Sequence, residues 1–355
     1  AQTTYYIDSS GGNDSNTGTT EQSAWKTLNK ANGFSFNTSG GNVYVKLKRG
    51  EIWRETLNPN RGGSGENNRI IFSSYGTGRK PQILGSNDLR SSTTTWTDMG
   101  SNLWRRSLSN SPFYVIFEKP NTATNWGYIQ SSSSACNSDY KFYYSSGYLY
   151  VFALSNPATY YNRIESPARA FAVGEITVQY ITLDSLEIWG SQEACVRTSN
   201  GHYLTIQNCD IHHVGNVSVR DGGQGDLLYI ISSNAVVRNN RIWEPGSHGI
   251  YQGMYNGYVG RNCIYEGNYI ANCYYTMIDI QHTGSAGSRY GNAGGHIIRN
   301  NYLIGDSMAQ GSIYNGAGAG IQVLGMRENG QNEWMKNIRI YNNVLIGMQW
   351  GINWT

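Results

Sequence analysis

Residues 237–242 read Val-Arg-Asn-Asn-Arg-Ile, and this stretch repeats along the C-terminal half of the chain. The same frame recurs at Leu183–Ile188, Ile206–Ile211, Tyr265–Ile270, Ile298–Leu303 and Ile340–Leu345. Its fourth position is occupied in turn by Leu186, Cys209, Asn240, Asn268, Asn301 and Asn343. A constant motif at uneven spacing predicts coils of fixed geometry that are joined by loops of variable length.

A second apolar motif follows each copy of the first. It reads Cys195-Val196-Arg197, Leu227-Leu228-Tyr229, Gly249-Ile250-Tyr251, Met277-Ile278-Asp279, Gly320-Ile321-Gln322 and Gly351-Ile352-Asn353. Because successive strand residues point to opposite faces, the middle residue is predicted to point inward and the third outward. Short strands in such a repeat predict an all-β solenoid, the parallel β-helix. The Asn residues would then form a ladder in which buried amides hydrogen-bond from coil to coil.

The composition agrees with an all-β class. Glycine accounts for 43 of 355 residues, charged residues for only 14%, and 27 residues are tyrosine, which disfavours disorder, coiled coils and helical bundles. The net charge of +3 and the absence of a Lys/Arg run argue against a nucleic-acid partner, and no apolar stretch is long enough for a membrane span. The five cysteines form no metal-type spacing and are predicted to be buried free thiols. The Lys-poor composition suggests a secreted protein, which we expect to be monomeric.

We predict a single domain over residues 1–355. Residues 1–85 would form the N-terminal cap and first coils, 86–170 an inserted β-rich segment, and 171–355 the regular coils with long loops. Helical spacing predicts a capping helix from Ser23 to Phe34, with Ser23 as its N-cap. The oxygen-rich loop with Asp8, Asn13 and Asp14 could hold calcium or form a hydrogen-bonded turn. We expect no cofactor to be required.

With these features the chain resembles the secreted right-handed parallel β-helix proteins of the pectate-lyase superfamily. The resemblance covers most of the chain and rests on the Asn ladder, the N-terminal helix and the opening pattern Tyr6-Ile7-Asp8…Gly11…Asn13-Asp14…Trp25-Lys26-Thr27-Leu28. It implies a right-handed solenoid that acts on polysaccharide. It leaves the activity open, because the superfamily holds lyases, glycoside hydrolases, epimerases, esterases and binding modules.

The loop lengths predict where a ligand would bind. Extra residues gather on both sides of one strand column, and long loops on a rigid scaffold are common binding sites. They would wall a groove whose floor is Arg197, Tyr229, Tyr251, Asp279, Gln322 and Asn353. Aromatic rings and amides suit an extended polysaccharide, which is the predicted partner. The alternative is a solvated sheet face decorated with tyrosine.

Two acids and two histidines are the predicted catalytic residues. Asp279 lies in mid-floor and Asp226 two coils earlier, a spacing that fits the acid and base of an inverting glycosidase. His248 precedes the intervening floor strand, and the polygalacturonases of this fold also place a histidine one coil after paired aspartates. The other motifs of that family are missing here. His282 ends the Asp279 strand, and Arg289 in the Gly-rich loop 284–295 is expected to contact the sugar.

A glycoside hydrolase is the favoured interpretation, and two others stay open. A polysaccharide lyase acting on an acidic glycan could use Arg197, His282 and Tyr251 as neutraliser and base, although no lysine occurs between Lys141 and Lys336. A non-catalytic module could bind insoluble polysaccharide such as cellulose through its many Trp and Tyr side chains. In that case the carboxyl groups of Asp279 and Asp226 would be dispensable.

Overall fold

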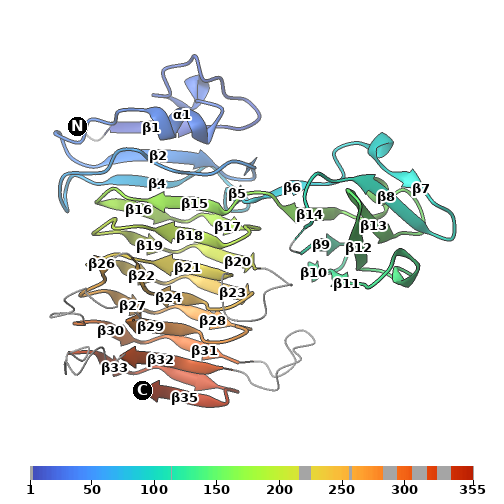
Figure 1. The fold of residues 1–355 in the computed structure, drawn as a ribbon. Helices are drawn as coiled ribbons and strands as arrows, with labels where there is room; N and C mark the ends of the chain where they lie inside the picture. Colours follow the sequence, from blue (N-terminus) through green and yellow to red (C-terminus); the bar gives the residue numbers. More distant parts are fainter. Residues whose placement is uncertain are drawn as a thin grey trace.

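The computed structural model describes residues 3–112, 114–215, 225–255, 258–282, 294–305, 318–325 and 337–354. Within these residues the chain winds into a tall solenoid, most of whose coils contribute one strand to each of three parallel sheets (Figure 1). A side lobe projects from the upper coils. The fold is therefore a parallel β-helix. Its right-handed sense stays a prediction.

Sheet I follows the first repeated motif, because the motif's apolar residues alternate with polar ones. Val45, Phe72 and Leu183 point into the core and are completely buried. Its hydrogen-bonded order is β1 (Thr3–Ile7), β2 (Val43–Lys48), β4 (Ile70–Tyr75), β16 (Ile181–Asp184), β19 (Thr205–Gln207), β22 (Val236–Arg238), β27 (Ile264–Glu266), β30 (Ile297–Arg299) and β33 (Arg339–Tyr341).

Sheet II follows directly after each turn of the repeated motif. Its order is β3 (Ile52–Trp53), β5 (Gln82–Leu84), β17 (Glu187–Trp189), β20 (Asp210–Val214), β23 (Arg241–Pro245), β28 (Tyr269–Ala271), β31 (Tyr302–Ile304) and β34 (Val344–Ile346). Sheet III carries the second motif and comprises β15 (Phe171–Ile176), β18 (Ala194–Thr198), β21 (Asp226–Ile230), β24 (Ile250–Gln252), β29 (Ile278–His282), β32 (Ala319–Gly325) and β35 (Trp350–Trp354). A short antiparallel pair, β25 (Met254–Tyr255) and β26 (Tyr258–Val259), lies beside the coils.

The turn between sheets I and II buries a column of side-chain amides. Asn240 Nδ2 donates to Asn268 Oδ1 at 3.0 Å, Asn268 Nδ2 to Asn301 Oδ1 at 3.0 Å, and Asn301 Nδ2 to Asn343 Oδ1 at 2.9 Å. Each amide also donates to a backbone carbonyl of the preceding coil, at 2.9–3.0 Å. Polar groups inside the solenoid are thereby paired, as buried polar groups must be.

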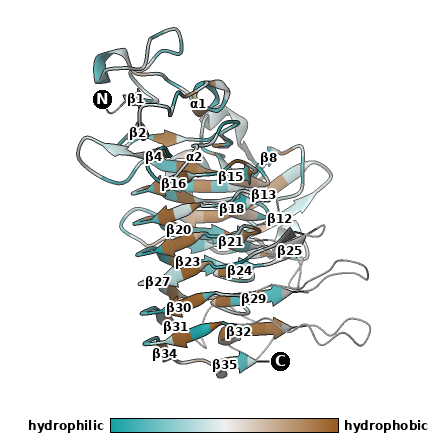
Figure 2. Cartoon of the chain, turned by 90° about the vertical axis from the view of Figure 1, so that its left-hand side faces the viewer, coloured by the Kyte–Doolittle hydropathy of each residue, from teal (hydrophilic) through white to brown (hydrophobic). Residues whose placement is uncertain are grey.

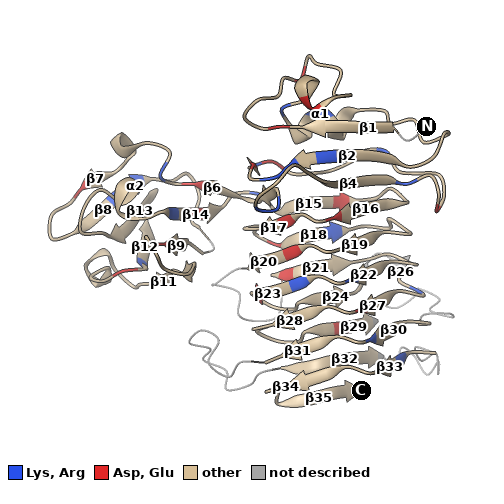
Figure 3. Ribbon diagram, turned by 180° about the vertical axis from the view of Figure 1, so that it is seen from behind, with Lys and Arg blue, Asp and Glu red and all other residues tan. Residues whose placement is uncertain are grey.

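One apolar core runs the length of the solenoid, and the apolar residues lie mainly on its strands (Figure 2). Charged residues are sparse on the lower coils (Figure 3). The five cysteines are buried and unpaired, which confirms the predicted free thiols. No helix in the described part of the chain is long and apolar enough to cross a membrane.

The N-terminal helix differs from its prediction. Helix α1 spans only Leu28–Gly33, and its N-cap is Thr27 rather than Ser23. Asp14 explains the late start, because its carboxylate accepts the backbone N–H groups of Lys26 and Thr27 and the Thr27 hydroxyl. These bonds hold the preceding residues extended. Ser23 instead ends the 3₁₀ helix η1 (Glu21–Ser23). Helix α1 lies at the N-terminal end of the solenoid and contributes Leu28 and Ala31 to the core.

The segment after β5 forms the side lobe, which has its own core around Phe117, Phe142 and Val151. The lobe contains two sheets, one of β6 (Ser86–Asp88), β9 (Ile116–Glu118), β10 (Asn125–Trp126) and β14 (Arg163–Pro167), the other of β7 (Thr97–Asp98), β8 (Leu103–Ser107), β11 (Tyr128–Ile129), β12 (Lys141–Ser145) and β13 (Tyr148–Phe152). The remaining helices are α2 (Pro157–Tyr160), η2 (Thr93–Thr95) and η3 (Ser133–Ala135). The lobe leaves and re-enters the solenoid through β6 and β14, which pair with each other.

Candidate active site

One register position of sheet III carries the side chains predicted to form the floor of the groove. Neighbouring strands pair Arg197 with Tyr229, Tyr229 with Tyr251, and so on through Asp279, Gln322 and Asn353. In every strand of the column except β35, the preceding residue, such as Ile250 or Ile278, is completely buried in the core. Strand alternation therefore turns the whole column away from the core. Walls of a groove stay a prediction.

Three predicted catalytic side chains meet at the centre of this sheet. The Nδ1 atom of His248 lies 2.8 Å from Oδ1 of Asp226, and its Nε2 atom lies 3.1 Å from Oδ2 of Asp279. The backbone N–H of His248 also donates to Asp226, at 3.2 Å. The three residues come from successive coils, Asp226 on β21, His248 just before β24 and Asp279 on β29. The imidazole thus bridges two carboxylates.

The surroundings of His248 fix its charge. Burial alone would lower the pKa of this imidazole, but the charges and hydrogen bonds of Asp226 and Asp279 outweigh it and raise the pKa to about 10. The side chain is therefore an imidazolium at neutral pH. Both ring nitrogens then carry protons, and each has a carboxylate acceptor.

Asp279 is completely buried, although its register position faces away from the core. Its exposed fraction is 0% and that of Asp226 is 5%, while the His248 side chain keeps 15%. Asp279 Oδ2 accepts from Nε2 of Gln281 at 2.6 Å, in addition to its contact with His248. Its Oδ1 atom is buried and has no hydrogen-bond partner among the described residues. The two oxygens of this carboxyl group are thus inequivalent.

Sequence reasoning missed Gln281, although strand alternation gave the signal. Gln281 lies two residues after Asp279 on β29, so both side chains belong to the same face. The phenol of Tyr251 donates to Gln281 Oε1 at 3.3 Å. A continuous chain of hydrogen bonds therefore runs from Tyr251 through Gln281 to Asp279.

Aromatic rings adjoin this cluster. Tyr229 and Tyr251 lie side by side with centroids 4.9 Å apart, and the His248 ring lies 5.4 Å from Tyr251. Tyr275, which sequence reasoning did not select, stacks on His248 at 5.8 Å. Half-buried tyrosines beside buried acids offer apolar faces for a sugar ring together with hydroxyl groups that can hydrogen-bond it.

The other predicted contact residues lie further along the column. Arg197 forms ion pairs with Glu175 at 3.0 Å and Glu193 at 3.4 Å, and its guanidinium lies over the Tyr229 ring. Gln322 Oε1 accepts from the Thr276 hydroxyl at 3.4 Å. Asn353 is half-buried on β35, two strands beyond Asp279.

Two predicted residues cannot be placed in the cluster. Arg289 lies outside the described residues. His282 ends β29, but its side chain lies outside what the structure describes. Their predicted roles stay predictions.

The N-terminal loop does not fit calcium. Asp8 accepts Nζ of Lys48 at 2.7 Å, and Asp14 caps α1, so their oxygens already have protein donors. A cation at Asp8 would also have to displace the Lys48 ammonium group. Across the described ranges, no group of three His, Cys, Asp or Glu side chains could hold a metal ion.

The chain is similar in structure to several solved proteins, although no family model matches its sequence and no curated protein matches it. One is the GH136 lacto-N-biosidase from Eubacterium ramulus (15% identity, TM-score 0.48). The match covers 99% of this chain and 53% of the lacto-N-biosidase chain, so this chain spans about half of that protein. Others are an alginate lyase from Paenibacillus sp. str. FPU-7 (12% identity, TM-score 0.40, 92% of this chain and 97% of its own) and the pectate lyase Pel9A (12% identity, TM-score 0.43, 100% of this chain and 78% of its own).

Proposed function

We propose that this protein is a glycoside hydrolase that cleaves a polysaccharide over sheet III, with Asp279 as its general acid and Asp226 as its general base. The carrying observation is the Asp226–His248–Asp279 cluster, in which one imidazole contacts two carboxylates at 2.8 and 3.1 Å. Glycoside hydrolysis requires a carboxyl pair that flanks the scissile bond. A secreted location suits a polymeric substrate and belongs to the same proposal.

The spacing of the two acids favours inversion. An imidazole ring and two hydrogen bonds separate the contacting oxygens, which is of the order of the ~6.5–9.5 Å between the carboxyl groups of inverting enzymes. Retaining enzymes hold their carboxyl groups only about 5 Å apart. In inverting enzymes the wider spacing leaves room for a water molecule between the sugar and the base.

Each acid has a defined part in this proposal. Asp279 donates a proton from Oδ1 to the glycosidic oxygen as the bond from that oxygen to the anomeric carbon breaks. Asp226 accepts a proton from the water whose oxygen bonds to the anomeric carbon. The products are two free sugar ends; Asp226 releases its proton to solvent, and Asp279 takes one up from solvent. The His248 imidazolium orients both carboxyl groups and stays charged.

The protonation of His248 weighs against the lyase alternative. A lyase needs a free base and a group that neutralises the uronate carboxylate. The imidazolium has no free nitrogen to act as a base, because Asp226 and Asp279 accept from both. Hydrolysis does not need an acidic sugar, and we therefore propose a neutral glycan as the substrate.

Activity on a panel of neutral and acidic polysaccharides tests the proposal, with Asp279→Asn and Asp226→Asn as variants. We expect new reducing ends from a neutral polymer, and a loss of about 10²–10⁴-fold in either variant, the usual contribution of a catalytic acid or base. Asp184→Asn is the matched control, because Asp184 is a hydrogen-bonded acid on sheet I.

Two outcomes would overturn the hydrolase. Ultraviolet absorbance of unsaturated products from an acidic polymer would establish a lyase. Co-sedimentation with insoluble polysaccharide, without product on any substrate and unchanged in both variants, would establish a binding module. The anomeric configuration of the first product, followed by NMR, separates inversion from retention.

A further inference from the structure

We infer that Gln281 is a positioning residue that makes Oδ1 of Asp279 the atom that meets the substrate; the inference rests on the proposed function. Gln281 donates to Asp279 Oδ2 at 2.6 Å, and His248 lies 3.1 Å from the same oxygen. Both donors thus hold one oxygen of a completely buried carboxyl group, while Oδ1 has no partner among the described residues.

The orientation of the Gln281 amide is itself fixed. Its Oε1 accepts from the Tyr251 phenol at 3.3 Å, which turns Nε2 toward Asp279. An amide turned the other way would place two acceptor oxygens against each other. The hydrogen bonds therefore run in one direction, from the strand with Tyr251 to the carboxyl group on β29.

This arrangement decides where a proton can reside. An oxygen that accepts from an amide and an imidazolium has little capacity left to hold a proton of its own. The proton of a neutral Asp279 must then lie on Oδ1, the buried oxygen that lacks a partner. A glycosidic oxygen at that place would supply the missing hydrogen bond, since an unpaired buried polar atom is costly.

The Gln281 donor favours the carboxylate that forms as Asp279 gives up its proton. Losing this donor therefore slows the proton transfer to the glycosidic oxygen.

The test compares Gln281→Leu and Gln281→Glu with Gln207→Leu. Gln207 is a matched control, because its Nε2 donates to Asp184 Oδ2 at 2.9 Å on sheet I. We expect Gln281→Leu to lower kcat about 10–100-fold, as the loss of a hydrogen bond to a charged group does, with little change in KM. Gln281→Glu, which keeps the shape of the side chain but loses the amide donor, should lower kcat at least as much.

A second readout needs no activity. The His248 ring contacts the same oxygen of Asp279 as Gln281, so its NMR signals should shift in Gln281→Leu but not in Gln207→Leu. Unshifted signals, or a KM effect alone, would overturn the inference. Shifted signals in Gln281→Leu, when the wild-type protein cleaves no glycan, would keep the arrangement around Asp279 and reject the hydrolase.

Discussion

At the residue scale, one imidazole organises the candidate site. His248 holds a carboxylate at each ring nitrogen, and Ser247 Oγ lies 2.8 Å from Nδ1 as well. The side chain is nearly buried, so its charge is stabilised by named neighbours rather than by water. Removing the imidazole would leave two carboxylates in a confined space without the cation that balances them.

The first residue-scale prediction concerns His248→Gln. In the wild type the pKa of His248 is raised above the ordinary 6.5 to about 10. The stabilisation that the charged imidazole gives the folded state is therefore full below about pH 6.5 and is lost as the pH rises through about 10. We expect the variant to unfold more readily by roughly 3 kcal/mol at pH 6, with a smaller difference at pH 10. Urea unfolding at both pH values measures this difference.

His202→Gln is the control for that experiment. Burial lowers the pKa of His202, so the folded protein favours the neutral ring at this position. The contribution of His202 to the stability of the fold is therefore lost as the pH falls. The two variants should therefore show opposite pH trends. The same trend in both would contradict the ion pairing of His248.

Sequence reasoning could name Asp226, His248 and Asp279 because all three are chemically active residues near one predicted strand column. The repeat supplied the coil spacing that brings them together. It could not supply the hydrogen bond of Gln281, the stacking of Tyr275 or the complete burial of Asp279, because these depend on side-chain conformations set by neighbouring coils.

At the element scale, the turn between sheets I and II carries the buried amide column. The side chain of Asn268 takes part in four of its hydrogen bonds: it accepts from the backbone and side chain of Asn240 and donates to Asn301 and the carbonyl of Val237. Its exposed fraction is 1%, so water cannot replace these bonds.

We predict that Asn268→Ala lowers the free energy of unfolding by about 3 kcal/mol or more, because several buried partners become unpaired. Asn343→Ala should cost less, since Asn343 is half-buried and water can reach its partners. Chemical denaturation of both variants measures the order. Equal losses would show that burial does not set the cost.

The two kinds of element differ in how well the sequence predicts them. The strand positions follow from a motif that recurs coil after coil, so each copy supports the others. The N-terminal helix has no such repeats, and its start depends on a carboxylate from another loop, Asp14, whose hydrogen bonds to Lys26 and Thr27 are not evident from spacing.

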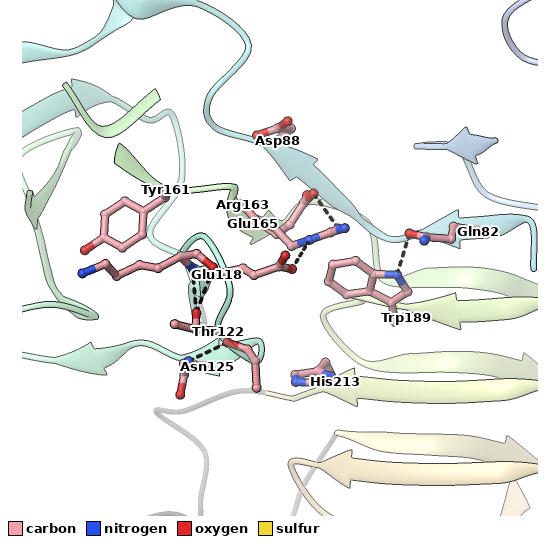
Figure 4. A network of polar contacts seen from close by, with 12 residues as sticks. Gln82, Asp88, Glu118, Thr122, Asn125, Tyr161, Arg163, Glu165, Trp189 and His213 are labelled. Carbon is pink, nitrogen blue, oxygen red and sulfur yellow. Dashed lines mark hydrogen bonds and ion pairs between the residues drawn. The ribbon is translucent and has the colours of Figure 1, made fainter. Parts of the chain in front are cut away.

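At the scale of the whole molecule, an ion-pair network joins the lobe to the solenoid. Figure 4 shows Arg163 between Glu118 and Glu165, at 3.3 and 3.4 Å. Glu165, only 1% exposed, also pairs with Arg54 at 2.5 Å, just beyond β3 of the solenoid. Beside this network, the Tyr114 hydroxyl donates to backbone carbonyls of Ser191 and His213.

We predict that Glu165→Ala loosens the lobe, because two guanidinium groups lose a shared buried partner, at a cost of about 3–5 kcal/mol. Limited proteolysis should cut the lobe of the variant faster than that of the wild type. The His248 NMR signals should stay unchanged, since the cluster lies within sheet III. A shift of those signals would instead reveal coupling between the lobe and the candidate site.

The paired stems of the lobe, β6 and β14, have a consequence for the order of folding. Strand β5 must find β17 across the entire lobe sequence, whereas most later coils close over far shorter intervals. Closing a long loop costs entropy, and contacts between distant residues slow folding. If the lobe assembles first around its own core, its paired stems bring β5 and the chain that leads to β17 close together. The entropy cost of closing the long loop is then already met when these strands pair. Pulse-labelled hydrogen exchange would then protect Leu149 and Val151 before Ile188, and the lobe would act as the folding nucleus on which the solenoid closes.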